Sequence, residues 1–196
     1  MLPEALQARL TEMAEGVPLT QLRQAAALIS ERYRGQRVPG QRLLTEDTEA
    51  LAYAQVRMPA TFSALSAALA WALDCTAARP DSLLDVGSGT GAAVWAADEL
   101  LPLKSVTCLE REDAMRRLGS GLMRAGSTAL REARWQSRDL TLAGPLGSAG
   151  LVTSAYVLNE LGGSDRAAAV SRLWEAAEQM LLIVEPGTPQ AWRMMM

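Results

Sequence analysis

The segment that decides the fold is SLLDVGSGTG, residues 82–91. Its apolar first half suits a strand that is buried on both faces. The glycines that follow allow a sharp turn at which the backbone can approach a ligand closely, and a helix after the turn would aim unpaired N–H groups at that ligand. The spacing Gly-x-Gly-x-Gly differs from the Gly-x-Gly-x-x-Gly fingerprint of dinucleotide sites, which argues against NAD. The alternative is a tight strand-to-helix turn that binds nothing.

Short apolar runs alternate with helical patterns from Pro80 to the end of the chain. Strands are predicted at 82–86, 105–110, 134–137, 150–155 and 180–185, and helices at 90–101, 113–125 and 164–179. Such an alternation is typical of an α/β fold in which right-handed crossovers build a parallel sheet between two helix layers.

The first 80 residues carry only helical patterning. Apolar residues recur at helical spacing over 6–13 and 22–33, and a loop rich in Gly and Pro is expected at 34–42. A longer helix over about 45–77 should be bent or split before Pro59, which removes an N–H from the helical ladder. The chain is therefore predicted to divide into an N-terminal helical region, 1–80, and an α/β domain, 81–196.

The composition fits a globular protein and excludes several chemistries. The chain has 196 residues, of which 49% are hydrophobic, and can bury a sizeable core. Its formal net charge is -3, so no protein-wide basic field favours nucleic acid, and any contact with a polyanion must be local. Histidine is absent, which excludes Ser-His, Cys-His and His-metal sites, and no cysteines stand at metal-ligand spacing. No metal site is expected.

Three features predict a cytoplasmic protein without a membrane segment. Cys75 and Cys108 lie in apolar stretches without a partner, which indicates buried thiols and a reducing compartment. The N-terminus lacks the pattern of a signal peptide. The longest uncharged run, residues 58–73, is shorter than a membrane span and is interpreted as a buried core helix.

Carboxylates stand where the strands of such a sheet end. Glu110 ends the second predicted strand, about 20 residues past the glycines, where it could accept both ribose hydroxyls of an adenosine. Asp139 follows the third strand and could accept an adenine amino group, and Asp85 adds negative charge beneath a cationic ligand. The alternative for Glu110 and Asp139 is a solvated strand end. The predicted cofactor-binding residues are Asp85, Gly87, Ser88, Gly89, Gly91, Glu110 and Asp139.

Four further stretches, taken with the glycine turn, resemble one family. They are residues 31–34, 50–61, 156–161 and 184–189, and the most specific are YVLNEL and EPGTP. Over most of residues 1–190 the chain resembles the methyltransferase-like proteins associated with the mitochondrial ribosomal small subunit and their bacterial relatives. These belong to the class I superfamily of S-adenosylmethionine-dependent methyltransferases.

The resemblance implies a Rossmann-like class I methyltransferase fold that binds S-adenosyl-L-methionine in domain 81–196. It also implies a role in small-subunit rRNA methylation or ribosome assembly. Members of the family continue past the EPGTP segment with a cysteine cluster that this chain lacks. We therefore expect a parallel sheet that is incomplete at the C-terminus, truncated after strand five.

In this fold the residues after the fourth strand face the transferred methyl group, which makes Tyr156, Asn159 and Glu160 the catalytic candidates. Alternatively, residues 159–163 only end a segment. Two other functions stay open: a catalytically inactive ribosome-assembly or RNA-binding factor that retains the fold, and a small-molecule methyltransferase. The second is disfavoured because only 5% of the residues are aromatic.

Arginines and an apolar strand suggest the partners. Arg32, Arg34, Arg37 and Arg42 surround Tyr33, and a second set comprises Arg111, Arg116, Arg117, Arg124, Arg131, Arg134 and Arg138. Arginines beside an aromatic ring can hold the phosphates and stack a base of rRNA, whereas the alternative is a solvated helix face. The apolar run 180–184 would form an open sheet edge, so either the tail 190–196 covers it or two chains pair there. We expect a homodimer.

Overall fold

The computed structural model describes the backbone of residues 1–34 and 46–195, and the side chains of residues 1–31, 46–189 and 191–193. Within these ranges five parallel strands form one sheet in the order β3-β2-β1-β4-β5. The strands are β1 (Ser82–Val86), β2 (Ser105–Glu110), β3 (Arg134–Ser137), β4 (Ala149–Ala155) and β5 (Ala177–Val184). The predicted α/β architecture is confirmed, and the first three strands have the predicted bounds.

Alternate residues of the central strands enter two separate hydrophobic cores. Leu83 of β1 and Leu151 of β4 belong to one core, whereas the next residue of each strand, Leu84 and Val152, belongs to the other. Because successive side chains of a strand point to opposite faces, this arrangement favours runs of consecutive apolar residues within the strands. The apolar runs of the sequence are thus explained by a sheet covered on both sides.

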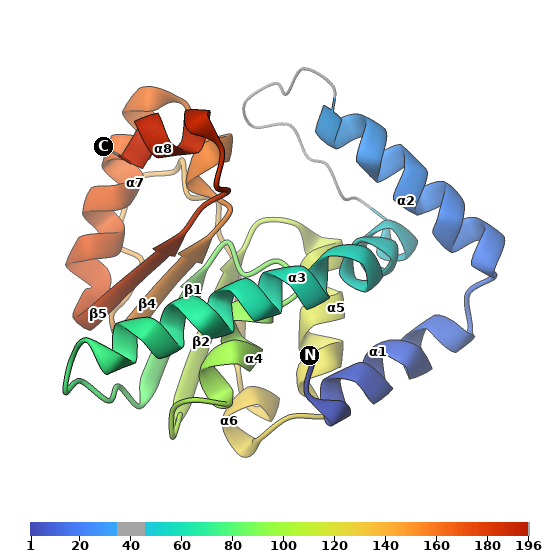
Figure 1. Cartoon of the computed structure of the whole chain (residues 1–196), viewed down its shortest axis with the longest axis horizontal. Coiled ribbons are helices and arrows are strands. Elements are labelled where there is room, and N and C mark those ends of the chain that lie inside the picture. The colour runs from blue at the N-terminus through green and yellow to red at the C-terminus, as the bar shows by residue number, and fades with distance from the viewer. Residues whose placement is uncertain (35–45, 196) are drawn as a thin grey trace.

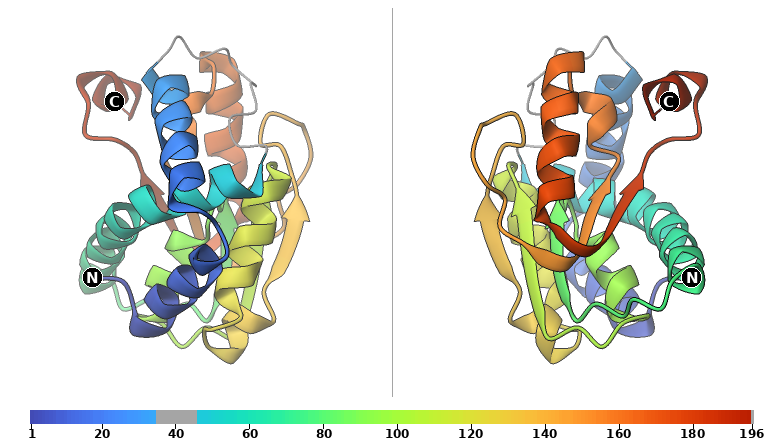
Figure 2. Two further views of the ribbon diagram at one scale, coloured as in Figure 1. Left: turned by 90° about the vertical axis from the view of Figure 1, so that its right-hand side faces the viewer. Right: turned by 90° about the vertical axis from the view of Figure 1, so that its left-hand side faces the viewer.

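Helices supply the outer walls of both cores. One face of the sheet packs against α3 (Asp47–Asp74), α4 (Ala92–Asp98) and α5 (Asp113–Met123), and the other against α7 (Gly163–Ala176). The two helix layers are seen on either side of the sheet in Figure 2. Figure 1 shows α1 (Glu4–Glu15) and α2 (Leu19–Arg34) on the side of α3 and α5. The expected N-terminal helices are therefore present, and α3 is built into the layer above the sheet.

The long helix was predicted to be bent or split before Pro59, and it is not split, because α3 continues through this residue. A proline leaves the carbonyl four residues earlier without its helical donor. Here Gln55, Val56 and Pro59 are all exposed, so water can satisfy that carbonyl. The break expected from sequence is avoided because the proline lies on the solvent side of the helix.

α3 is also the one helix of the described ranges that is long and apolar enough to cross a membrane. Its Phe62, Leu65, Leu69 and Leu73 are buried in the core above the sheet. Their spacing of three and four residues places them on one face of the helix. Residues 58–73, which were expected to form a buried core helix, are thus buried on one face, whereas the other face is exposed.

Short elements and one cysteine differ from expectation. The sequence patterns gave no sign of α6 (Thr128–Arg131), the 3-10 turn η1 (Leu158–Glu160) or α8 (Pro189–Met195), which are too short to show a period. Cys108 is buried as predicted, and burial raises the pKa of its thiol well above the ordinary range. Cys75 was expected to be buried but is exposed, because it follows the last residue of α3.

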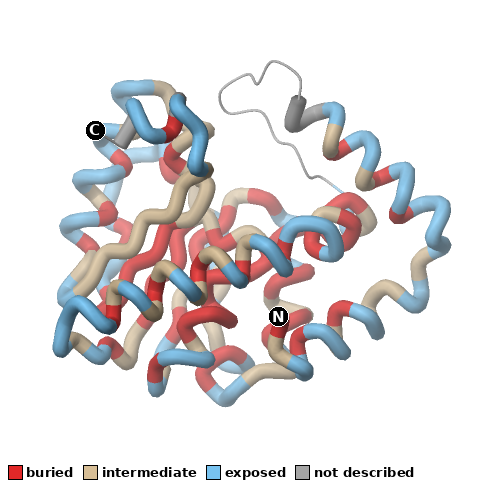
Figure 3. The backbone as a smooth tube through the Cα atoms, viewed as in Figure 1, coloured by how far each residue is buried: buried red, intermediate tan, exposed pale blue. Residues whose placement is uncertain are grey.

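The edge of the sheet at β5 is only half covered. Residues 180–184 are of intermediate exposure, in contrast to the buried β1 and β4, as Figure 3 shows. Among the described strands β5 pairs with β4 alone. The tail forms α8 beyond the carboxyl end of β5 and does not run back along its edge (Figure 1).

Candidate functional site

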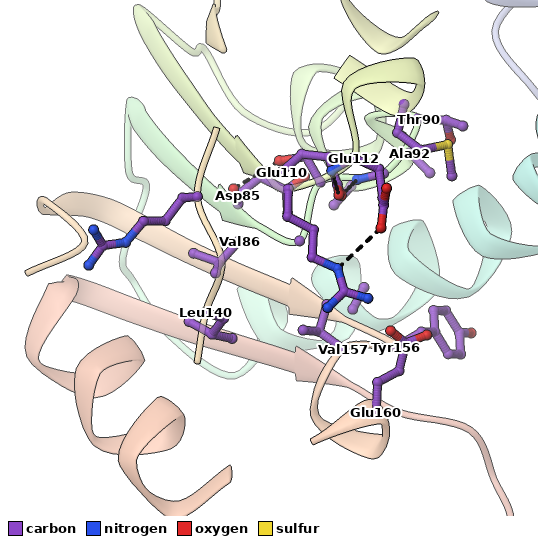
Figure 4. A pocket seen from close by; sticks show the side chains of 18 of the residues that line it. Asp85, Val86, Thr90, Ala92, Glu110, Glu112, Leu140, Tyr156, Val157 and Glu160 are labelled. Carbon is purple, nitrogen blue, oxygen red and sulfur yellow. Dashed lines mark hydrogen bonds and ion pairs between the residues drawn. The ribbon is translucent and has the colours of Figure 1, made fainter. Parts of the chain in front are cut away.

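A cavity of about 400 Å³ opens at the carboxyl ends of β1, β2 and β4. This is the point where strand order reverses from β1 to β4, and in doubly wound sheets ligands lie there. Figure 4 shows Asp85, Glu110 and Glu112 on one side of the cavity and Tyr156, Val157 and Glu160 on the other. The first group comes from β1, β2 and the turn between β2 and α5, and the second from the loop after β4.

The glycine turn forms the floor of the cavity. Gly87 has a φ of 74° and its N–H donates to the carbonyl of Leu109 over 2.8 Å, which holds the turn against β2. A Cβ at Gly87 would lie 2.2 Å from Cγ2 of Val157, so a side chain here would clash with the loop after β4. Gly87, Ser88 and Gly89 line the cavity. Gly91 does not; it lies at the start of α4 in the left-handed conformation.

Glu110 is held in place by the backbone on two sides. Its Oε2 accepts a hydrogen bond from the N–H of Gly89 over 2.8 Å, and its Oε1 accepts one from the N–H of Glu112 over 2.8 Å. The side chain is buried and lines the cavity. Each carboxylate oxygen has a second lone pair, so a fixed and still accepting carboxylate stands beside the glycine turn.

Asp85 lies fully buried below the turn. Its Oδ1 accepts from the hydroxyl of Thr153 over 2.6 Å, and its Oδ2 has no hydrogen-bond partner among the described residues. Burial raises the pKa of Asp85 to about 6, against the opposing effect of the nearby hydroxyl groups of Thr153 and Ser88. A buried acceptor that is only half satisfied is costly, which makes it a candidate for contact with a bound cation.

Asp139 lines the cavity from the loop after β3, but its oxygens are engaged within the protein. Oδ1 accepts from the N–H of Thr141 over 2.8 Å and from its hydroxyl over 2.7 Å. Oδ2 faces Nη1 of Arg111 at 4.0 Å. The sequence placed Asp139 at the correct end of the sheet and could not show this competition.

The three catalytic candidates separate in the structure. Tyr156, at a positive φ of 61°, and Glu160 line the cavity. Asn159 is not among the lining residues, because its side-chain amide donates to Oε2 of Glu185 over 2.7 Å. The N–H of Leu158 donates to the other oxygen of Glu185 over 2.8 Å.

The end of β5 thus supports the whole loop after β4. The N–H of Tyr156 donates to the carbonyl of Val184 over 2.8 Å, next to the contacts made by Glu185. A non-glycine residue at positive φ is uncommon and persists where its surroundings determine it. These bonds provide that constraint and hold Tyr156 at the cavity.

One wall of the cavity was missed from the sequence. Tyr53, Met58, Thr61 and Leu65 of α3 line it, although none was a predicted site residue. They fall in or next to the stretch 50–61, which carries part of the family resemblance. Periodicity marked this helix as core, and a periodic pattern does not distinguish a side chain that faces a core from one that faces a cavity.

The predicted arginine clusters receive little support from the side-chain contacts. Arg32, Arg34, Arg37 and Arg42 lie outside the described side chains. Of the second set, Arg116 pairs with Asp113 and Arg117 with Asp47. Arg131 and Arg138 donate to the backbone carbonyls of Gly126 and Ala143. Much of this set is therefore engaged within the protein.

Comparison with known proteins gives a family and a fold. The family model described as "Mitochondrial small ribosomal subunit Rsm22" matches residues 47–196. The human protein described as "Ribosome assembly protein METTL17, mitochondrial" is 32% identical over 123 residues, which are 60% of this chain and 27% of that protein. The chain thus spans about a quarter of this relative.

Solved methyltransferases share the architecture. CalS10, an amino pentose methyltransferase from Micromonospora echinaspora, has a TM-score of 0.57 at 21% identity, with 80% of this chain and 61% of that chain covered. The magnesium protoporphyrin IX methyltransferase ChlM from Synechocystis PCC 6803 has a TM-score of 0.52 at 15% identity, with 85% and 76% covered. The predicted Rossmann-like class I methyltransferase fold is confirmed.

The expectation of a cytoplasmic location was wrong. The matching family is named for a mitochondrial ribosomal subunit, and the human relative is described as mitochondrial. These findings indicate a mitochondrial setting in place of a general cytoplasmic one. Buried or unpaired thiols indicate a reducing compartment, and this property does not distinguish a mitochondrial from a cytoplasmic location.

Proposed function

Because this chain belongs to the family of the mitochondrial small ribosomal subunit protein Rsm22, we propose that it binds S-adenosyl-L-methionine in the cavity at β1 and β2 and acts in assembly of the small ribosomal subunit. The proposed reaction is methyl transfer to small-subunit rRNA. The carrying observation is that the glycine turn, Glu110 and Asp85 meet in one cavity of about 400 Å³. That volume lies within the range of small-molecule sites.

The residues present fit the proposed cofactor. Gly87 keeps the turn free of a side chain at the cavity, where a Cβ would clash with Val157. The fixed carboxylate of Glu110 can accept from ribose hydroxyls, and Oδ2 of Asp85 supplies a buried negative charge for the cationic part of the ligand. Asp139 lies in the loop after β3, where it can accept from the amino group of adenine.

In this reaction the main task of the protein is to position the reactants. A bound sulfonium supplies an electrophilic methyl group to an acceptor in line with it. The chain must hold the acceptor and exclude water. Tyr156 and Glu160 are the cavity residues proposed for this task, with the ring of Tyr156 against the acceptor and the carboxylate of Glu160 as its hydrogen-bond or proton acceptor.

A second candidate is an assembly factor that binds the cofactor and methylates nothing. It is favoured by the position of Asn159, whose amide is bound to Glu185 and turned from the cavity. Incubation of the protein with labelled S-adenosylmethionine and small-subunit particles separates the two. Labelled rRNA supports the enzyme, whereas binding without product after many hours supports the assembly factor.

Replacing Glu110 by glutamine should weaken binding of S-adenosylmethionine about tenfold, because the amide loses the charge that strengthens hydrogen bonds from the ribose. The matched control is Glu99→Gln, at an exposed residue that follows α4. Calorimetric titration of both variants and the parent protein is the measurement. Equal affinity in Glu110→Gln and the parent would remove Glu110 from the site.

RNA contact is proposed to be local and sensitive to salt. Replacing Arg34, Arg37 and Arg42 together by glutamine should flatten the slope of log affinity for small-subunit rRNA against log salt by up to about 2 to 3. The reason is that each phosphate contact that is lost reduces the number of counterions released on binding. Filter binding at several salt concentrations gives the slope, and an unchanged slope would assign these arginines to a solvated surface.

We also propose that two chains pair along the half-exposed β5. The unpaired side of an edge strand is a template for another strand unless a charge, proline or bulge protects it. Ile183→Lys should therefore lower the mass measured by light scattering to that of a monomer, while Leu142→Lys, at an exposed residue away from β5, should not. A parent protein that remains monomeric over a wide concentration range contradicts the pairing.

A further inference from the structure

Two arginines of α7 flank the face by which this helix packs on the sheet. The buried residues of that face are Ala169, Leu173 and Ala176. At about 100° per residue, Arg166 and Arg172 lie roughly 60° to either side of it. Both arginines are half-buried, whereas the remaining residues of α7 are exposed. Each guanidinium group can therefore reach a different loop beside the sheet.

Arg166 holds the loop between β4 and α7, which contains η1. Its Nε donates to the carbonyl of Leu158 over 3.0 Å, and its Nη2 donates to the carbonyl of Leu161 over 2.7 Å. The planar fork of a guanidinium group suits two acceptors at once. Tyr156 and Glu160 lie in this loop and line the cavity, so Arg166 supports the acceptor end of the cavity.

Arg172 holds the loop between β3 and β4 in the same way. Its Nη2 donates to the carbonyl of Leu140, and its Nη1 donates to the carbonyl of Leu142. Its Nε donates over 3.2 Å to the carbonyl of Ala168, which lies one helical turn earlier and orients the guanidinium group. Leu140 is buried and, like the preceding Asp139, lines the cavity. Arg172 therefore supports the nucleoside end of the cavity.

The helix α7 thus carries the anchors of both loops. Hydrogen bonds from a charged donor are stronger than those between neutral groups, and four carbonyls of the two loops accept such bonds. In the right-hand view of Figure 2, α7 stands between the loop after β3 on one side and η1 on the other. The two loops are attached through different side chains, so each attachment can be removed without the other.

We propose that Arg166 and Arg172 are positioning residues that fix the two ends of the cavity separately, Arg172 the nucleoside end and Arg166 the acceptor end. The inference rests on the proposed function, since it divides that cavity into a cofactor end and an acceptor end. A loop that loses its anchor samples several conformations. The affinity for a ligand then falls in proportion to the fraction of time that the loop is in place.

The first test is calorimetric binding of adenosine to the parent protein, Arg166→Met, Arg172→Met and Arg79→Met. Methionine removes the donors and the charge and keeps an apolar stem. Arg79 is the matched control, because its Nη1 also donates to three carbonyls and it lies outside the cavity lining. Arg172→Met should bind adenosine about threefold to tenfold more weakly, as for a loop that is in place roughly a tenth to a third of the time. Arg166→Met and Arg79→Met should match the parent.

Hydrogen exchange without ligand gives a readout that a general loss of stability would not reproduce. Arg166→Met should speed exchange of the backbone amides of residues 157–162 about fivefold or more and leave residues 139–145 unchanged. Arg172→Met should show the reverse pattern, and Arg79→Met should match the parent in both segments. Arg172→Lys keeps the charge without the planar fork, so its effects should lie between those of the parent and Arg172→Met. The lysine variant also serves if Arg172→Met does not fold.

The two readouts separate failure of the anchors from failure of the cofactor site. Equal adenosine affinity in Arg172→Met and the parent overturns the positioning role of Arg172. Faster exchange of both loops in either variant overturns the separate control of the two ends, since it would mean that α7 itself had moved. The expected exchange pattern in a protein that does not bind adenosine overturns the proposed cofactor site and supports the attachment of the loops.

Discussion

Replacing Gly87 by alanine is expected to lower the free energy of unfolding by about 2 to 5 kcal/mol. The φ of 74° costs a residue with a Cβ roughly 1 to 2 kcal/mol. The new Cβ would lie 2.2 Å from Cγ2 of Val157, and forcing extra volume into a packed site costs about 1 to 3 kcal/mol. Urea unfolding followed by circular dichroism gives the difference.

Two further variants identify the cause. Gly163→Ala is the matched control, because a methyl group on this first residue of α7 would meet no atom within 4 Å and its φ is not positive; its effect should stay within about 1 kcal/mol. Adding Val157→Ala to Gly87→Ala should restore the part of the unfolding free energy that is lost to the clash. The part that is lost to the positive φ should remain. A Gly87→Ala variant as stable as the parent would show that the turn can relax and that Val157 does not close it.

The second large effect concerns Asp85 and pH. Its pKa is raised to about 6 in the folded protein by burial, from about 4 in the unfolded chain. The folded state therefore holds the proton more tightly than the unfolded state does. The resulting stability is fully present below about pH 4 and is lost as pH rises through about 6, a total of roughly 3 kcal/mol.

Asp85→Asn removes this titration. Between pH 4.5 and pH 7.5 the variant should gain about 2 kcal/mol of unfolding free energy relative to the parent, whatever the cost of fitting the amide. Urea titrations at both values measure it, with Asp98→Asn, at a partly exposed residue at the end of α4, as control. A parallel pH dependence of Asp85→Asn and the parent would mean that Asp85 does not titrate in this range.

The same carboxylate should affect the two ligands differently. Binding of cationic S-adenosylmethionine by the parent should weaken as pH falls below about 6, because Asp85 then loses its charge. Uncharged adenosine should not follow this trend. Identical pH profiles for both ligands would place the cationic part of the cofactor away from Asp85.

The architecture could be predicted because the relevant signals are local. β1 and β4 carry apolar runs of two or three residues that enter both cores in turn, a pattern typical of strands covered on both faces. The path of α3 through Pro59 could not be predicted, since it depends on which side of the helix faces water. α8 has seven residues, too few for a helical period to appear. The division of the chain at residues 80 and 81 remains a prediction.

The positions of site residues could be predicted where these residues lie at or just after the ends of strands. Glu110 and Asp139 could be placed because parallel strands end at the same edge of the sheet. The contacts of Arg111 and Asn159 could not be predicted, because each depends on which side chain lies next to it in the fold. Arg111 turns toward Asp139 and Asn159 toward Glu185, contacts across 28 and 26 residues of sequence. Patterns of spacing do not encode such pairs.

The edge strand β5 also carries the loop that bears Tyr156. Three hydrogen bonds join this loop to Val184 and Glu185, at the end of a strand whose outer side pairs with nothing among the described strands. A partner that docks along β5 would therefore affect the hydrogen bonds that hold Tyr156 at the cavity. By thermodynamic reciprocity, a ligand that orders Tyr156 changes the affinity of that docking partner by the same factor. Docking of a partner along β5 and binding of a ligand in the cavity would then be coupled through this strand.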